Sequence, residues 1–220
     1  MLVFMDENGR LREQQKIDNL IEESPMEAFG GIIQRRQPQL VVVGGMGTQT
    51  HGLYQRITEM VRNFTAPEAQ QNDDGLNAPP PATEEQQGTP VIFVHDDIAR
   101  IYQHSKRAED EFGELPLTGK YCIGLARYAQ SPINEFAALG EDITAISIDP
   151  EQRLLPHLKF LGAVERAFVN TVNHIGVDIN IAVRDTHYQH LLQYVAGLGP
   201  RKAQALVRRI ASRVCFQYNI

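Results

Sequence analysis

Hydrophobic and polar positions follow two different patterns along this chain, and the change between them divides it into two parts. The first part contains short apolar runs bounded by turn residues. The segments "PQLVVVGG" (38–45) and "PVIFVHDD" (90–97) are continuous apolar runs, which is typical of strands buried on both faces. From Pro150 onward the apolar positions recur at helical spacing throughout. We therefore expect an α/β domain over 1–150, followed by a small all-helical domain over 151–220.

Further elements follow from the same patterns. The opening "MLVFMDENGRLREQQKI" predicts a hairpin, with a turn over 6–9 between strands at 2–5 and 11–17. Helices are predicted over 27–34, 51–64, 98–111 and 120–129, with "SPINEFAALG" after them. The segment "LKFLGAVERAFVNTVNHIG" predicts a long amphipathic helix that Gly176 ends, and a pair of helices over about 188–213 closes the chain.

The segment Thr65–Pro90 differs from both parts. It holds three consecutive prolines at 79–81 among Gln, Glu, Asp and Ala, with almost no apolar residue. Such a segment cannot bury enough surface to offset the entropy of ordering it. We predict a disordered insertion in the first domain.

The distribution of charge is uneven. The 220 residues carry a net charge of -6. Residues 1–150 hold 12 Lys+Arg against 23 Asp+Glu, whereas residues 151–220 hold 9 against 4. A phosphate backbone is repelled by the first balance and attracted by the second, so any contact with nucleic acid is expected in the C-terminal part.

Composition excludes other classes of protein. No stretch approaches the roughly 20 apolar residues of a membrane-spanning helix, and the polar N-terminus does not resemble a secretory signal. Cys122 and Cys215 lie far apart in apolar surroundings, which favours reduced, buried thiols in an intracellular protein. We expect neither a membrane partner nor a cofactor.

The most specific motif is "VAGLGPRKA" (195–203), which fits the helix-hairpin-helix pattern apolar–x–Gly–apolar–Gly–x–x–x–Ala. Gly197 and Gly199 allow the turn backbone angles that other residues disfavour. They also allow amide groups to approach a phosphate at the start of the following helix, where the helix dipole favours anions.

Four more residues complete the motif. Leu198 is expected to fill the space between the paired helices, and the small Ala203 allows their close packing. Arg201 and Lys202 add positive charge beside the expected phosphate. The predicted nucleic-acid-binding residues are therefore Gly197, Gly199, Arg201 and Lys202, although such hairpins also serve as packing elements between helices.

Two other candidate sites are weaker. "VVVGGMGTQTHG" lacks both the spacing G-x-G-x-x-G and a P-loop Gly-Lys-Ser/Thr, so we interpret it as a tight turn between a strand and a helix. His187 and His190 are spaced to share a helix face, but no cysteine lies nearby to complete a zinc site. Surface or capping histidines are the simpler interpretation.

A two-metal nuclease needs three or four converging carboxylates. The available candidates are Asp6, Asp96 and Asp97, and the last two follow a strand as metal ligands often do. However, the strand before Met46 leads to no acidic residue. Asp96 and Asp97 are therefore weak metal candidates, and we expect them to act as helix N-cap groups.

The motifs together resemble one family. "VNHIGVDINIAV" followed by "LLQYVAGLGPRKA" is similar to the suppressor-of-Ty six family of eukaryotic transcription elongation factors and histone chaperones, which is related to bacterial Tex. "FMDENGRLRE", "VHDDIARIYQHSKRAEDEF" and "GLARYAQSPINEFA" resemble its YqgF segment, which has an RNase H-like fold. The resemblance covers the chain outside 65–90 and implies a central fragment of a longer protein, lacking the first strand of the RNase H-like sheet and ending after a first helix-hairpin-helix.

The resemblance also bears on catalysis. Active YqgF and resolvase relatives place an acid after the central strand, where Met46 or its glycine neighbours stand. Asp96 or Asp97 matches a second acidic position, and "YCIGLARYAQ" offers no acid for a later one. The resemblance therefore implies a pseudo-nuclease, not an enzyme.

Three hypotheses follow for the function. The leading one is a non-catalytic scaffold within a nuclear elongation factor and histone chaperone, with the RNA polymerase II elongation complex and histones as partners implied by the resemblance. The hairpin would then bind DNA or RNA weakly. The alternatives are a metal-dependent, structure-selective nuclease that uses Asp6, Asp96 and Asp97, and a DNA-repair-type module that binds DNA through the hairpin.

Overall fold

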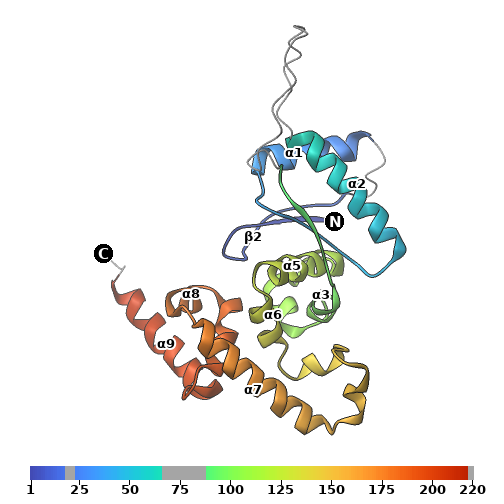
Figure 1. The fold of residues 1–220 in the computed structure, drawn as a ribbon. Helices are drawn as coiled ribbons and strands as arrows, with labels where there is room; N and C mark the ends of the chain where they lie inside the picture. Colours follow the sequence, from blue (N-terminus) through green and yellow to red (C-terminus); the bar gives the residue numbers. More distant parts are fainter. Residues whose placement is uncertain (18–22, 66–87, 218–220) are drawn as a thin grey trace, which may run out of the picture. The chain divides into compact units, whose positions relative to one another are not determined.

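The computed structural model describes residues 1–17, 23–65 and 88–217 (Figure 1). Most of the predicted disordered insertion, 66–87, lies outside these residues. The strands are β1 (Leu2–Met5), β2 (Leu11–Gln15), β3 (Val41–Gly44) and β4 (Val91–Val94). The α-helices are α1 (Glu23–Arg36), α2 (Thr48–Thr65), α3 (Asp97–Tyr102), α4 (Lys106–Phe112), α5 (Leu117–Gln130), α6 (Pro132–Leu139), α7 (His157–Ile175), α8 (Ile179–Arg184) and α9 (Gly199–Gln217). The 3-10 segments are η2 (Gly140–Ala145), η3 (Pro150–Leu154) and η4 (Thr186–Tyr194).

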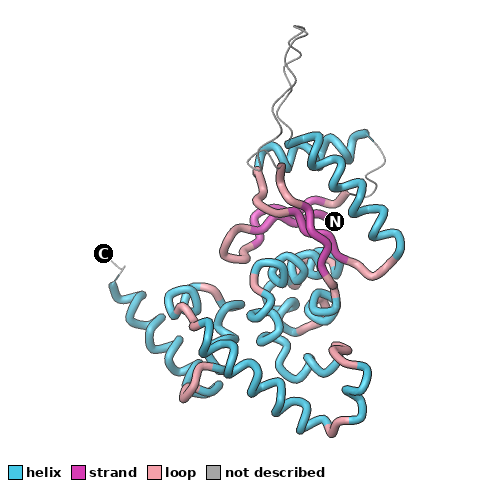
Figure 2. Tube along the Cα trace, in the orientation of Figure 1, coloured by secondary structure: helices cyan, strands magenta, loops and turns pink. Residues whose placement is uncertain are grey.

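The chain forms two compact units. The first comprises residues 1–4 and 12–96, and the second comprises residues 5–11 and 97–220 as far as they are described. Figure 2 shows that after β4 the chain is helical between short loops. The predicted domain limits, 1–150 and 151–220, remain a prediction.

The first unit is built on a parallel pair of strands. β3 and β4 pair in register from Val41 opposite Val91 to Gly44 opposite Val94, and α2 lies between them in sequence. α1 and α2 pack against this pair around a core that contains Phe29, Ile33, Val43, Ile57, Met60 and Val61.

The prediction that both strands are buried on two faces was wrong. Of β3 only Val43 is buried, and Phe93 of β4 is 45% exposed. Continuous apolar runs report the chemistry of a strand's two faces, but they do not report whether both faces are covered. In the first unit, the apolar core contains Val43, and Val41 and Val91 pack against it, so it covers one face of the strand pair.

The predicted glycine turn between β3 and α2 is confirmed. Only Gly45 to Gly47 separate the two elements. Gly45 has φ +142°, and a Cβ there would lie 2.6 Å from the Thr50 hydroxyl oxygen, so both the backbone angle and the close approach require glycine.

After β4, the second unit contains two helices where the sequence pattern predicted one. We expected one helix over 98–111, but α3 ends at Tyr102 and α4 begins at Lys106. Ser105 stands between them with an extended backbone, and its hydroxyl accepts a hydrogen bond from the N–H of Ala108 at 3.1 Å. This N-cap starts a new helix where the apolar spacing alone continues the old one.

A buried arginine holds the turn between β1 and β2 within the second unit. Arg127 of α5 is 5% exposed. Its Nε donates to the carbonyl oxygen of Gly9 at 3.1 Å, its Nη1 donates to the Tyr102 hydroxyl at 3.2 Å, and it pairs with Glu111 at 2.8 Å. Three parts of this unit therefore supply acceptors to one guanidinium, which has five N–H donors.

The same turn is tied to the C-terminal helices. The Nε of Arg10 donates to the buried carboxylate of Asp185 at 2.7 Å, directly after α8. Gly9 has φ +72°, and a Cβ at that position would lie 2.8 Å from Nε2 of His187. The turn over 6–9 was predicted, but its contacts with both α5 and η4 were not.

The rest of the second unit has an apolar interior made by its helices. One cluster joins α3, α6 and η2 through Ile98, Leu139, Ile143 and Ile146. A second joins α6, α7 and η4 through Ala137, Val172 and Leu191. A third joins α8, η4 and α9 through Ala182, Leu192 and Ala203, and this cluster positions the candidate site.

Candidate nucleic-acid interface

The site is the turn that connects η4 to α9. Gly197 has φ +84° and Gly199 has φ +65°, both in the left-handed region. A Cβ at either glycine would meet no atom within 4 Å. The two glycines are therefore required by the backbone angles of the turn and not by crowding, which leaves open space beside the turn.

The two sides of the hairpin differ in their helical type. The second side, α9, is an α-helix that starts at Gly199 with Pro200 in its first turn. The first side, η4, is a 3-10 segment where the apolar pattern suggested an ordinary helix. The turn closes through hydrogen bonds from Val195 N to Leu192 O at 3.2 Å and from Leu198 N to Val195 O at 3.0 Å, both spanning three residues.

The side chain of Asn173 on α7 holds the turn in place through two hydrogen bonds to its backbone. Its Oδ1 accepts a hydrogen bond from the N–H of Ala196 at 2.9 Å, and its Nδ2 donates to the carbonyl oxygen of Tyr194 at 3.0 Å. One side chain thus satisfies the backbone on both sides of Val195. Sequence reasoning missed this residue, because a polar residue on an amphipathic helix carries no sign of a partner in the turn.

The apolar members of the motif pack as the motif predicts. Ala203 is 5% exposed and lies in one cluster with Ala182 and Leu192, so the small residue does allow α9 to approach α8 and η4. Leu198 is half-buried. It lines an open apolar cavity of about 280 Å³ together with side chains of α7, α8, η4 and α9, including Ile179 and Leu206.

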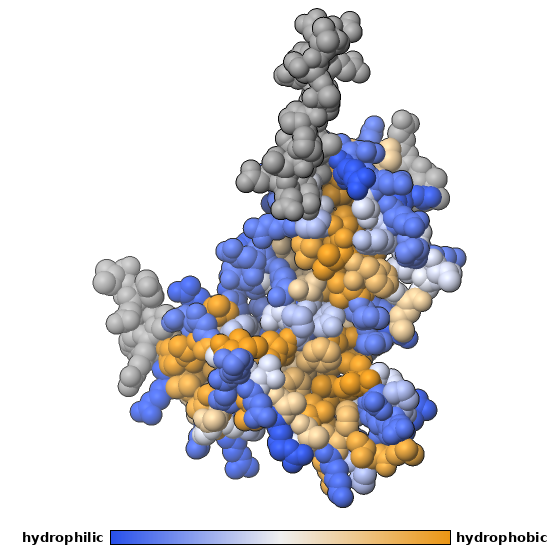
Figure 3. Space-filling model, in the orientation of Figure 1, coloured by the Kyte–Doolittle hydropathy of each residue, from blue (hydrophilic) through white to orange (hydrophobic). Residues whose placement is uncertain are grey.

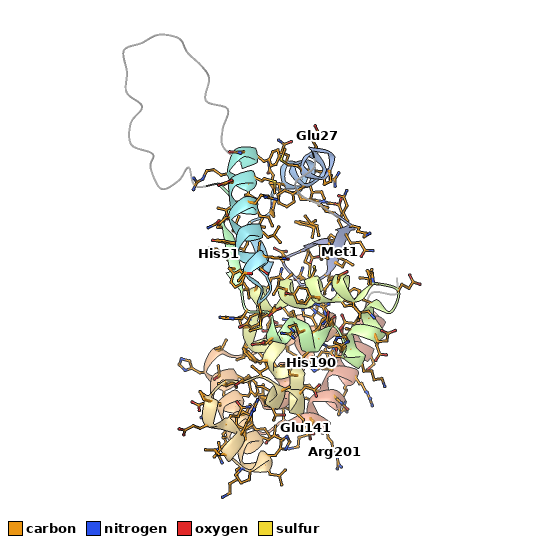
Figure 4. The ribbon with its side chains drawn as sticks, turned by 90° about the vertical axis from the view of Figure 1, so that its right-hand side faces the viewer. Met1, Glu27, His51, Glu141, His190 and Arg201 are labelled. Carbon is orange, nitrogen blue, oxygen red and sulfur yellow. The ribbon has the colours of Figure 1, made fainter. Side chains whose placement is uncertain are left out.

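The basic members of the motif face solvent. Arg201 and Lys202 are both exposed, and Figure 4 shows Arg201 pointing away from the surrounding helices. The ammonium group of Lys202 donates to the carbonyl oxygen of Gly197 at 3.0 Å, so it lies over the turn itself. An ammonium group has three donors, and this bond uses one of them.

The chemistry of the turn suits an anion. Amide groups in the first turn of a helix have no intrahelical acceptor, and the helix dipole adds partial positive charge there. Pro200 has no N–H, which leaves the amides of Gly199 and Arg201 as donors. With two cationic side chains beside them, the turn combines the features that bind phosphate.

The preceding signature "GVDIN" joins α7 to α8. Gly176 ends α7 with φ +85°, and its N–H donates to the carbonyl oxygen of Val172 at 2.8 Å. The Asp178 carboxylate then accepts a hydrogen bond from the N–H of Asn180 at 2.7 Å and caps α8. This part of the motif has a structural role, because it brings α8 against α9.

The acidic candidates do not form a metal site in the described part of the chain. Asp6 accepts hydrogen bonds from the backbone of Asn8 at 3.0 Å and Arg10 at 2.9 Å, so it builds the turn between β1 and β2. Asp96 is 5% exposed in the position before α3, and Asp97 is the first residue of that helix. Within residues 1–17, 23–65 and 88–217, no group of three or more Asp, Glu, His or Cys side chains could hold a metal ion.

Several buried groups of the second unit have shifted pKa values. Burial raises the pKa of Tyr102 to about 12, against the opposing effect of Arg127. Burial also raises the pKa of Glu135, a fully buried residue that pairs with Arg107. These groups belong to the packed interior around the Arg127 network, so we assign them to stability.

His187 and His190 are half-buried, which is less exposed than the predicted surface histidines would be. Burial lowers the pKa of both, to about 4 for His190, with nearby Arg107 as the next cause there. Cys122 is a half-buried thiol whose pKa is raised by burial, whereas the side chain of Cys215 lies outside the described residues.

Known families match both parts of the chain. Residues 1–140 match a YqgF family model described as "Holliday-junction resolvase-like of SPT6", and residues 141–215 match a helix-hairpin-helix motif model. These matches confirm the predicted fold class, an α/β RNase H-like domain followed by an all-α helix-hairpin-helix domain. None of the helices that the structure describes combines the length and the apolar character needed to span a membrane.

Individual relatives carry one shared name. The chain is 41% identical to "Transcription elongation factor SPT6" of Mycosarcoma maydis over 96% of its length and 42% identical to the Neurospora crassa protein "Transcription elongation factor spt-6" over 94%. It is 34% identical to "Transcription elongation factor spt6" of Schizosaccharomyces pombe over 96%. The chain spans only 13%, 15% and 14% of these three relatives. Their names describe a transcription elongation factor and state no enzymatic activity.

Proposed function

This chain belongs to the SPT6 family of transcription elongation factors, and we propose that it is a non-catalytic scaffold within such a factor that also binds the backbone of nucleic acid. The observation that carries the second half is the turn between η4 and α9. It joins two left-handed glycines, amide donors at a helix start and the exposed cations Arg201 and Lys202. The binding residues that we propose are Gly197, Gly199, Arg201 and Lys202.

The scaffold half of the proposal is supported by what the acidic residues do. Asp6 is a hydrogen-bond acceptor inside a turn, and the family resemblance puts Met46 or its glycine neighbours where active relatives carry an acid. We propose that the metal-binding set is incomplete and that the RNase H-like domain is kept for its architecture. The buried network around Arg127 fits this role, because it rigidifies the second unit without exposing a reactive group.

The proposal extends to the setting of the longer protein. We place it in the nucleus, with the RNA polymerase II elongation complex and histones as partners, because the relatives are elongation factors. The opposite charges of the two parts support the proposal that each part binds a different kind of partner. Residues 1–150, with 23 acidic against 12 basic residues, suit a basic partner, whereas the basic C-terminal part suits nucleic acid.

Fluorescence anisotropy tests the binding half. The chain is titrated onto a labelled DNA duplex at about 50 to 200 mM salt, and the double variant Arg201→Ala/Lys202→Ala is compared with wild type. We expect weaker binding of the variant to all sequences alike and a salt slope lower by about two. Equal affinity of the two proteins would show that the hairpin is only a packing element.

The same DNA tests the scaffold half. After incubation with Mg²⁺ and then Mn²⁺, duplex, forked and branched substrates are examined on a denaturing gel. We expect intact DNA in every lane. Cleavage by wild type that is lost in Asp96→Asn would support the nuclease alternative and overturn the scaffold proposal.

A further inference from the structure

Helix α9 presents its described cations on one side. At about 100° per residue, Arg201, Lys202, Arg208 and Arg209 fall within an arc of about 120° around the helix axis. All four are exposed. The opposite side of α9 packs against α8 and η4 through Ala203 and neighbouring apolar residues. The helix is therefore amphipathic, with its apolar side occupied and its basic side in solvent.

No acidic side chain that the structure describes neutralises the positive charge on this side. From residue 186 to the end, the sequence contains five Lys or Arg residues and no Asp or Glu. In the described part of α9, none of the four cations forms an ion pair, whereas Arg127 and Arg10 pair with carboxylates elsewhere in the same unit. Unpaired like charges on one surface attract a polyanion.

The dimensions of the basic side fit a nucleic-acid backbone. From Gly199 to Arg209 the helix rises about 15 Å, at 1.5 Å per residue. One strand of a duplex carries a phosphate about every 3.4 Å along its axis, so this length matches about four phosphates. The small residues Ala205 and Ser212 lie among the cations and leave room for close approach.

We infer that the basic side of α9 continues the phosphate contacts of the hairpin along a duplex, so that Arg208 and Arg209 are binding residues as well. This rests on the proposed function, because Arg201 and Lys202 begin the same surface. The contacts are made to the sugar-phosphate backbone, and they carry no sequence preference.

Two properties of α9 select a duplex over other anionic partners. The exposed side of its described residues has no aromatic side chain, so it lacks the stacking platform on which single-stranded nucleic acid is bound. Its apolar side is packed into the second unit and cannot enter a lipid bilayer. DNA and RNA duplexes share the required backbone charge, and the experiment separates them.

The test compares two pairs of cations in the 220-residue chain. Arg208→Ala/Arg209→Ala removes the pair along α9, and Arg201→Ala/Lys202→Ala removes the pair at the hairpin. Arg153→Ala/Lys159→Ala is the matched control, since it makes the same change of charge with exposed residues. Lys159 lies 14 residues, or about 21 Å along α7, from the Asn173 clamp. Circular dichroism verifies that each variant is folded.

Each protein is titrated onto labelled DNA duplex, RNA duplex and single-stranded DNA of one length, at about 50 to 200 mM salt. We expect Arg208→Ala/Arg209→Ala to raise Kd for a duplex at least about tenfold near 100 mM salt and to lower the salt slope by about two. The control should change Kd less than about twofold. Arg208→Lys/Arg209→Lys should keep the wild-type slope, because lysine keeps the charge. The duplex with the lower Kd identifies the natural source of the phosphates.

The outcomes separate this inference from the proposed function. If Arg201→Ala/Lys202→Ala weakens binding and Arg208→Ala/Arg209→Ala has no more effect than the control, the inference is overturned and the proposed function stands. If only Arg208→Ala/Arg209→Ala weakens binding, the hairpin loses its assigned role, and the inference that α9 continues the contacts of the hairpin is overturned with it. Absence of duplex binding at about 50 mM salt, or stronger binding to single strands, overturns the inference.

Discussion

The Oδ1 atom of Asn173 accepts a hydrogen bond from the backbone N–H of Ala196 at 2.9 Å, across 23 residues of sequence. The amide nitrogen of the same side chain donates to the carbonyl oxygen of Tyr194 at 3.0 Å. The conformation of the glycine turn therefore depends on α7 as well as on the turn's own sequence. A binding surface made of backbone amides needs such support, because the amides bind an anion only when they are held in place.

The first prediction concerns this clamp. Asn173→Ala removes both hydrogen bonds, and we expect a loss of about 1 kcal/mol in the free energy of unfolding, since the side chain is exposed and water replaces part of the loss. Duplex binding should weaken more than stability alone explains. Urea unfolding and anisotropy measure the two effects. Asn170→Ala, an exposed asparagine of the same helix, is the control, and an equal effect of both variants would contradict the account.

The second prediction concerns the glycines of the turn. Gly197→Ala and Gly199→Ala should each lower the free energy of unfolding by about 1 to 2 kcal/mol, because alanine disfavours the left-handed angles found there. Gly162→Ala is the matched control within α7. It has open space around it and a helical backbone, so the same substitution should raise stability by about 0.5 to 1 kcal/mol. Thermal unfolding of the three variants checks the difference in sign.

The third prediction concerns Arg127. Arg127→Met keeps most of the side-chain volume but leaves Gly9 O, the Tyr102 hydroxyl and Glu111 without their donor. We expect a loss of about 3 kcal/mol or more, as for other partly buried ion pairs with one member removed. Tyr102→Phe removes only one hydrogen bond and should cost about 1 kcal/mol. Similar losses for the two variants would show that the arginine does not organise the network.

The fourth prediction concerns pH and His190. Burial lowers the pKa of this imidazole from 6.5 to about 4, so the unfolded chain takes up a proton between these values while the folded chain does not. The neutral histidine therefore contributes fully to stability above about pH 6.5, and this contribution is lost as the pH falls toward 4. Wild type should lose stability relative to His190→Gln over that range.

Glu135 acts in the opposite direction, because burial raises its pKa and favours the protonated form in the folded chain. Both proteins contain Glu135, so the difference between their unfolding free energies isolates His190. Chemical unfolding at several pH values measures this difference. A difference that stays constant between pH 4 and 6.5 would show that His190 titrates alike in the folded and unfolded chain.

Patterns of apolar residues were enough to predict most elements of the fold. The strands β3 and β4, the long helix α7 and the glycine turn before α9 stand where the spacing placed them. These features depend on local propensities and on periodicity, which one sequence displays. The division of 98–111 at Ser105 shows the limit, since a single N-cap can end a periodicity that the apolar positions continue.

Contacts between distant segments could not be predicted in this way. Nothing local marks Arg127 as the residue that holds the turn at Gly9, or Asn173 as the clamp of Ala196. Asp6 shows that a candidate site can also fail because of a contact that the sequence does not reveal. It was a candidate metal ligand, but its carboxylate accepts hydrogen bonds from the backbone of its own turn.

The most direct test of the proposed binding site observes the hairpin amides themselves. A ¹⁵N-labelled sample of the chain is titrated with a short DNA duplex, and amide resonances are followed by TROSY NMR at low and then raised salt. The account predicts saturable shifts at Gly199 and Arg201 that are reversed by salt, with Gly162 unchanged as an internal reference. Saturable shifts elsewhere with unmoved hairpin amides would contradict the account and assign the duplex to another surface.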